Sequence, residues 1–178
     1  MIKDYLSIIG TQIHQHDDGN ILAVASDVII DTDTGKIEGL WVKSLTLPLT
    51  NAVLRTSDII EWKSKIYIKD DSVISESDDL INITEILEKE IMIVGNNVEN
   101  KEGRYLGSVY DFDFDTKNLK LRQIYTEKKF IGLFGYQRRI FSFNSIIKIK
   151  KSAIIVEDKT EIKEEIIEPV ILESPAVT

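Results

Sequence analysis

Two stretches decide the fold of this chain: Gly19-Asn20-Ile21-Leu22-Ala23-Val24-Ala25-Ser26-Asp27 and Gly103-Arg104-Tyr105-Leu106-Gly107-Ser108-Val109-Tyr110-Asp111. They are separated by 84 residues, and the same separation relates Asp31 to Asp115 and Ile37 to Leu121. A period of this length is too long for one unit of a solenoid and suits a small domain. The repeat therefore predicts two copies of one small β-rich module.

Each copy predicts short strands separated by turns. In the first copy we expect strands over residues 5–13, 21–31, 37–42, 54–56, 59–62 and 65–68, with a hairpin at 31–36. In the second copy we expect strands over residues 91–95, 105–115, 119–126, 139–143, 146–149 and 153–156, with a loop over 128–137. Apolar residues at helical spacing predict a helix over 78–89. Short strands at this spacing indicate a small closed or half-open barrel.

The predicted fold class is mainly all-β, with two tandem small β-barrels joined by a short helix. The expected boundaries are 1–76 for the first barrel, 77–90 for the helical connector and 91–158 for the second barrel. Residues 159–178 form an acidic tail that we expect to be disordered.

Composition excludes several classes of protein. The net charge is −8, and residues 157–178 contribute seven acidic and two basic side chains. Nucleic-acid binding is disfavoured, because phosphate recognition needs clustered Lys and Arg. The chain has no cysteine, which excludes disulfides and zinc–thiolate sites. We expect no transmembrane segment and no signal peptide, and therefore a cytoplasmic protein.

The motifs resemble those of the PRC-barrel family. In the second copy they are Gly103 to Asp111, then Phe130-Ile131-Gly132-Leu133-Phe134-Gly135, then Ile140-Phe141-Ser142-Phe143-Asn144-Ser145-Ile146. In the first copy they are Asp27-Val28-Ile29-Ile30-Asp31 and Thr56-Ser57-Asp58-Ile59-Ile60. The first copy departs from the pattern, with Ala23 in place of Gly107 and Pro48 in place of a Gly-rich loop. The resemblance covers about residues 6–157.

The resemblance implies a non-catalytic protein with two tandem PRC-barrel domains and no cofactor. Known members are mostly assembly and docking modules, including the cytoplasmic part of a photosynthetic reaction-centre subunit and the C-terminal half of a ribosome-maturation factor. It implies an adaptor or scaffold that binds another protein or protein complex, including one held at a membrane. The alternative is an RNA- or ribosome-maturation factor, although the first half resembles a second barrel rather than that factor's first domain. Neither the partner nor the oligomeric state follows from the sequence.

One basic, aromatic-rich stretch is the candidate docking loop. Its residues are Lys128, Lys129, Phe130, Phe134, Tyr136, Arg138 and Arg139. Arg and aromatic side chains dominate the energetics of protein interfaces, which favours protein docking. Two alternatives remain: a loop whose phenylalanines are only structural, and bases stacked on its aromatic rings.

The acidic tail contains a second candidate motif. Its apolar residues are Ile166, Ile167, Val170, Ile171 and Leu172. Such a segment could add a strand to the sheet edge of a partner. The alternatives are an end without function and a strand that docks back on the barrel.

Metal binding is the least favoured function. Asp111, Asp113 and Asp115 alternate with two phenylalanines, so we expect one carboxylate face and one apolar face. The spacing fails the calcium-loop pattern, which leaves cation binding by this face open but disfavoured. His14 and His16 could bind a transition metal, but the local sequence offers no third ligand. We expect Trp41 and Trp62 to pack in the core or between the modules.

Overall fold

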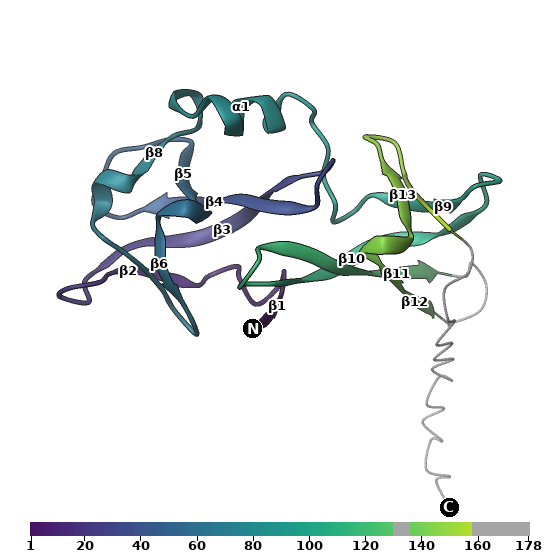
Figure 1. The fold of residues 1–178 in the computed structure, drawn as a ribbon, viewed down its shortest axis with the longest axis horizontal. Coiled ribbons are helices and arrows are strands. Elements are labelled where there is room, and N and C mark those ends of the chain that lie inside the picture. The colour runs from purple at the N-terminus through teal and green to yellow at the C-terminus, as the bar shows by residue number, and fades with distance from the viewer. Residues whose placement is uncertain (130–135, 158–178) are drawn as a thin grey trace, which may run out of the picture.

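The computed structural model describes residues 1–129 and 136–157. Within these residues the protein is mainly β-structure, with a single α-helix, α1 (Ile81–Leu87). The strands form one curled 14-stranded sheet, in which the two halves of the chain lie side by side and α1 runs above the first half (Figure 1). No helix in these two ranges has the length and apolar composition needed to cross a membrane.

The first half of the sheet is built around a long hairpin. Its strands are β2 (Gln12–Gln15), β3 (Ile21–Asp31), β4 (Lys36–Ser44), β5 (Ala52–Arg55), β6 (Ile59–Trp62), β7 (Ile66–Ile68) and β8 (Ile74–Glu76). Strands β3 and β4 pair antiparallel, and β2 pairs antiparallel with β3 and parallel with β7. Short 3₁₀ turns are formed by η1 (Thr56–Asp58), η2 (Asp71–Val73) and η3 (Ser77–Asp79). This arrangement curls the sheet so that its apolar face is enclosed.

The second half repeats the pairing pattern of the first. Its elements are β9 (Asn97–Asn100), β10 (Tyr105–Asp115), β11 (Lys120–Lys129), β12 (Tyr136–Ser142), η4 (Phe143–Ser145), β13 (Ile146–Ile149) and β14 (Ile154–Val156). Strand β9 pairs antiparallel with β10 and parallel with β14, as β2 does with β3 and β7. Irregularities follow Ala25 in the first hairpin and Val109 in the second, 84 residues later. The sequence repeat is therefore also a repeat of strand register.

The tips of the two hairpins join the halves through reciprocal hydrogen bonds. The amide of Ile37 donates to the carbonyl of Leu119 at 2.7 Å, and the amide of Leu121 donates to the carbonyl of Gly35 at 2.8 Å. A further strand, β1 (Ile2–Asp4), lies at the start of the chain but pairs with β10 in the second half. The halves therefore share main-chain hydrogen bonds.

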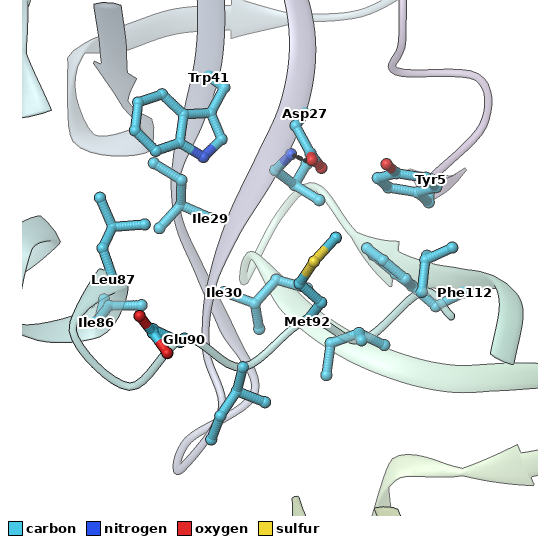
Figure 2. A pocket seen from close by; sticks show the side chains of 14 residues that line it. Tyr5, Asp27, Ile29, Ile30, Trp41, Ile86, Leu87, Glu90, Met92 and Phe112 are labelled. Carbon is cyan, nitrogen blue, oxygen red and sulfur yellow. Dashed lines mark hydrogen bonds between the residues drawn. The ribbon is translucent and has the colours of Figure 1, made fainter. Parts of the chain in front are cut away.

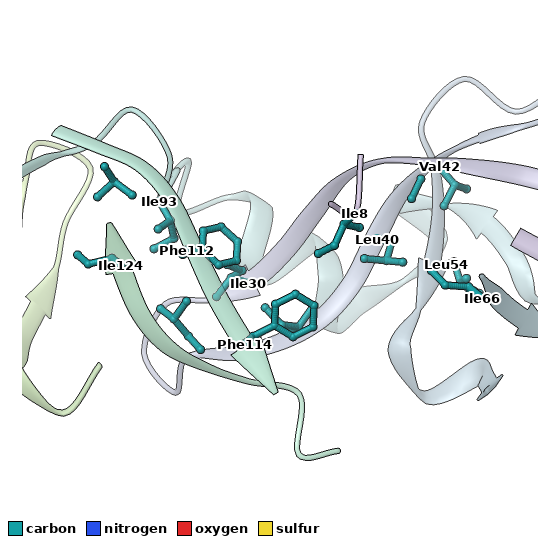
Figure 3. Packing of buried hydrophobic residues seen from close by; sticks show 14 of the residues in the cluster. Ile8, Ile30, Leu40, Val42, Leu54, Ile66, Ile93, Phe112, Phe114 and Ile124 are labelled. Carbon is teal, nitrogen blue, oxygen red and sulfur yellow. The ribbon is translucent and has the colours of Figure 1, made fainter. Parts of the chain in front are cut away.

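A large apolar core runs through both halves, and a smaller cluster lies between α1 and the sheet. The large core extends from Val42, Leu54 and Ile66 through Phe114 to Ile124, as Figure 3 shows. Phe112 and Phe114 are both buried, which confirms the expected apolar face of their strand. The ring of Trp62 lies 5.5 Å from that of Phe114, so a tryptophan of the first half packs against the second, as expected.

The expected strands at 5–13 and 91–95 are wrong in most of their length. Residues 5–10 and 92–95 form turns and loops, and the strands come later, as β2 and β9. Gly10 and Gly95 have φ of +85° and +86°, and their amides bond to the carbonyls of Ala25 and Val109 at 2.8 Å. These glycines turn the chain where the apolar pattern suggested extension.

Most other expected elements are confirmed with shifted ends. The ranges 21–31, 59–62, 105–115 and 146–149 match β3, β6, β10 and β13. The helix expected over 78–89 is confirmed only as α1, because residues 77–79 form the 3₁₀ turn η3. The loop expected over 128–137 is wrong at its ends, because β11 continues through Lys129 and β12 starts at Tyr136. Cross-strand pairing of Lys128 with Gln137 and of Lys129 with Tyr136 extends the hairpin.

Candidate protein-docking surface

The outward surface of β10, β11 and β12 gathers aromatic and cationic side chains. We call this surface the docking face, and its residues are Tyr105, Tyr110, Tyr125, Tyr136, Arg138 and Ile140. Exposed fractions are 39% for Tyr105, 36% for Tyr110, 45% for Tyr136 and 36% for Ile140. A contiguous patch of exposed apolar and aromatic side chains often marks an interaction site.

The centre of the docking face is held by ring contacts. The rings of Tyr110 and Tyr125 lie 6.2 Å apart, and the guanidinium of Arg138 lies 5.3 Å above the ring of Tyr110. Arg138 also pairs with Glu127 on β11, with an Nη2–Oε2 distance of 3.3 Å. The guanidinium is therefore positioned on the sheet before any partner arrives.

A polar cluster lies beside these rings. The amide of Gln123 donates to the hydroxyl of Tyr125 at 2.6 Å, and that hydroxyl donates to Asp113 Oδ2 at 3.0 Å. Burial of Tyr125, together with its hydrogen bond to Asp113, raises the pKa of the phenol. Asp113 is only 5% exposed, and its Oδ1 has no hydrogen-bond partner among the described residues. That oxygen is buried beneath the surface, so the polar cluster supports the tyrosine ring from below.

The equivalent surface of the first half is covered by α1. Strand register equates Asp113, Tyr125 and Ile140 with Ile29, Trp41 and Val53. In the first half, Ile29 and Val53 are buried against Ile83 of α1, with Trp41 packed beside them. Val53 is fully buried, whereas its counterpart Ile140 is 36% exposed. The structure describes no covering element over the second-half surface.

The residues predicted for the docking loop occupy different environments. Tyr136 and Arg138 lie on the docking face, while Arg139 alternates to the other side beside the fully buried Thr126. Lys128 bonds to the carbonyl of Tyr105 and lies 5.6 Å from its ring centroid, at one end of the face. Lys129 pairs with Tyr136. The other predicted residues lie outside the described residues: Phe130 and Phe134, and the tail residues Ile166, Ile167, Val170, Ile171 and Leu172.

Sequence reasoning did not identify Tyr105, Tyr110, Tyr125 or Ile140 as surface residues. The repeat carried the signal that could have found them, since Tyr125 and Ile140 align with apolar residues that a helix of the first half covers. In the first half this helix follows β8, and the described chain after β14, which ends at Glu157, contains no counterpart. The comparison of the two copies therefore predicts an open surface better than local composition does.

A separate hollow lies between β3 and residues 86–94. Its volume is about 300 Å³, and Figure 2 shows Tyr5, Asp27 and Phe112 on one side with Trp41 and Leu87 on the other. Burial, followed by the charge of Asp27, raises the pKa of Tyr5 to about 12. The described lining is mostly aliphatic and contains no histidine, cysteine, serine or threonine. The ionisable side chains of this lining are those of Tyr5, Asp27 and Glu90.

The groups considered for metal binding make other contacts in the fold, and the rings of His14 and His16 both lie against Tyr67. Asp113 belongs to the cluster with Tyr125, and Asp111 accepts a hydrogen bond from the amide of Phe112 at 2.8 Å. Nδ1 of His14 lies 2.7 Å from the carbonyl of Gly19, and His16 lies beyond the end of β2. Residues 1–129 and 136–157 contain no group of three or more His, Cys, Asp or Glu side chains able to hold a metal ion.

Comparison with models of known protein families finds no matching family, and comparison with curated proteins finds no matching sequence.

Proposed function

We propose that this chain is a non-catalytic adaptor that binds another protein through the docking face, on a scaffold of two PRC-type barrels joined by the α1 segment. The observation that carries the proposal is the contrast between the two copies. Helix α1 covers Ile29, Trp41 and Val53 in the first half, whereas the described chain leaves Tyr125 and Ile140 open in the second.

The chemistry of the docking face defines the partner that it suits. In the first half, the equivalent surface receives apolar side chains of a short helix, among them Ile83 and Leu87. We therefore expect the partner to present an amphipathic helix, whose apolar residues pack on Ile140 and the tyrosine rings. A carboxylate on that helix would pair with Arg138, which lies on the surface of the sheet.

The test is a measured affinity for the partner. Immobilised full-length chain would capture binding proteins from lysate, and a captured protein would then be purified and titrated calorimetrically against the chain. We expect Ile140→Glu to weaken that affinity at least tenfold, because it places a charge in the centre of the apolar contact. Tyr110→Ala should act in the same direction.

The matched control is Ile147→Glu on β13. Ile147 is 48% exposed and lies outside the docking face, so this variant should bind the partner as the native chain does. Equal affinities for the Ile140→Glu variant and the native chain would contradict the proposal. Capture of RNA, lost at raised salt, would instead support the maturation-factor alternative.

A further inference from the structure

The outer edge of β12 lacks the strand that protects its counterpart. In the first half, β5 pairs with β4 on one side and with β8 on the other. In the second half, β12 pairs with β11, and no described strand lies on its other side (Figure 1). An open edge of this kind is a template for adding a strand.

The described chain ends at the point of the repeat that precedes β8 in the first half. After β7 the first half passes through η2 directly into β8, which crosses to β5. Strand β14 is the equivalent of β7, because both pair parallel with the second strand of their half. The described chain ends at Glu157, immediately after β14, and 21 residues follow.

The sequence after β14 resembles the segment from η2 to β8 at alternate residues. Register places Ile66 opposite Ile13 and Ile154 opposite Val98, so a separation of 88 residues relates the two regions. At that separation the sequence offers four matched pairs: Asp70 with Asp158, Ser72 with Thr160, Ile74 with Ile162, and Glu76 with Glu164. Local composition alone does not reveal this match, because the segment lies in a stretch that is rich in acidic residues.

Each of the four first-half residues has a structural task. Asp70 caps η2 by accepting hydrogen bonds from the amide and hydroxyl of Ser72. Ile74 is buried in the core at 4% exposure. The carboxylate of Glu76 accepts hydrogen bonds from the amides of Thr50 and Asn51, both at 2.9 Å, which stabilises the chain entering β5. A segment that keeps three of these residues and has a threonine for the serine can perform the same tasks.

We propose that residues 158–164 of this chain add an antiparallel strand to the outer edge of β12, as β8 does to β5. Pairing in the β8 register places Ile162 opposite Phe141, Lys163 opposite Ile140 and Glu164 opposite Arg139. Charge agrees with this occupant, because the register places the carboxylate of Glu164 opposite Arg139. The proposal does not rest on the proposed function, since it requires no partner protein.

The test uses disulfide formation in the full chain, which has no native cysteine. Residues directly opposite in an antiparallel pair have Cα atoms about 4.5–5.5 Å apart, a separation that a disulfide can span. We expect Ile140→Cys with Lys163→Cys to crosslink within one chain at least ten times faster than Ile140→Cys with Lys159→Cys. The off-register pair would be about 13 Å further along the strand. The benchmark is Val53→Cys with Ser75→Cys, which are opposite each other on β5 and β8.

A second measurement avoids cysteine and tests the same pairing. Ile162→Pro removes an amide and breaks a strand, so amide hydrogen exchange along residues 136–142 should speed up at least fivefold. Ile171→Pro, outside the proposed strand, should leave that exchange unchanged. Equal crosslinking of both cysteine pairs, or unchanged exchange in the Ile162→Pro variant, would overturn the proposal. Disulfides formed between chains would also overturn it, by placing the segment on a second copy.

Discussion

At the scale of single residues, the two long hairpins differ in the residue that adopts a positive φ in the turn. Gly35 has φ of +70°, and the equivalent turn of the second hairpin uses Leu119 at φ of +57°. A left-handed residue is costly for any side chain with a Cβ, so glycine is the expected choice. Glycine is favoured at position 35 for a second reason, because a Cβ there would lie 2.4 Å from the ring of Phe143.

Gly35→Ala should therefore lower the free energy of unfolding by roughly 1–3 kcal/mol, through backbone strain and displacement of Phe143. The measurement is urea unfolding followed by circular dichroism. Gly19→Ala is the matched control, because Gly19 has φ of +73° but a Cβ at that position would meet no other atom within 4 Å. The control should lose only the strain contribution. Equal losses in both variants would show that Phe143 moves aside freely.

At the scale of elements, α1 is held by packing rather than by its own stability. It has seven residues and no side-chain hydrogen bond at its N-cap, and helices this short do not persist alone in water. Ile83 is 2% exposed and packs with Ile29 and Val53, whereas Ile81 on the same helix is 75% exposed. One face of the helix therefore carries its attachment to the sheet.

Ile83→Ala should lower the free energy of unfolding by about 2–4 kcal/mol, because it removes buried methyl groups and leaves a cavity between helix and sheet. Ile81→Ala should change it by less than about 0.5 kcal/mol, as is usual for an exposed site. Chemical denaturation of both variants provides the measurement. A small loss for Ile83→Ala would mean that α1 detaches before the sheet unfolds.

The sequence predicted elements well where turn chemistry agreed with the alternation of apolar residues. Strands β3 and β10 were found with their ends, because Asp- and Gly-containing turns flank them. Strands β1 and β8 were missed because each has a single apolar residue, whereas β7 and β14, which also have three residues, are wholly apolar and were expected. Lys128 and Tyr136 were assigned to a loop because the stretch that contains them carries Gly132 and Gly135, whereas cross-strand pairing keeps both residues extended.

The docking face was predictable only in part, for a reason that lies in tertiary structure. Tyr136 and Arg138 were chosen from composition, but Tyr110 and Ile140 reach the same surface only through strand pairing and a local irregularity of β10. Their exposure depends on an element that covers one copy and has no described equivalent in the other. Neither fact is encoded in a local stretch of residues.

At the scale of the whole molecule, the shared core explains how two small copies reach adequate stability. Modules of roughly 75 residues are marginal alone, because they bury a smaller share of their surface than larger domains do. Here the hairpin tips exchange main-chain hydrogen bonds, and Trp62 packs on Phe114 across the junction. Because the apolar cluster is continuous, we expect both halves to unfold together.

This cooperativity can be tested with a mutation in one half and a probe in the other. Both tryptophans belong to the first half, but Trp62 contacts Phe114 across the junction, so the probe of the first half is Trp41 in a Trp62→Phe background. Ile154→Ala lies in β14 of the second half, at a fully buried position, and should cost about 2–5 kcal/mol. If the halves unfold together, the urea midpoint seen by tryptophan fluorescence falls as far as the midpoint seen by circular dichroism. Ile66→Ala, the equivalent change in β7, should lower both midpoints similarly, because Ile66 is also fully buried. A fluorescence midpoint that stays unchanged in the Ile154→Ala variant would instead show that each half unfolds independently, despite the core that they share.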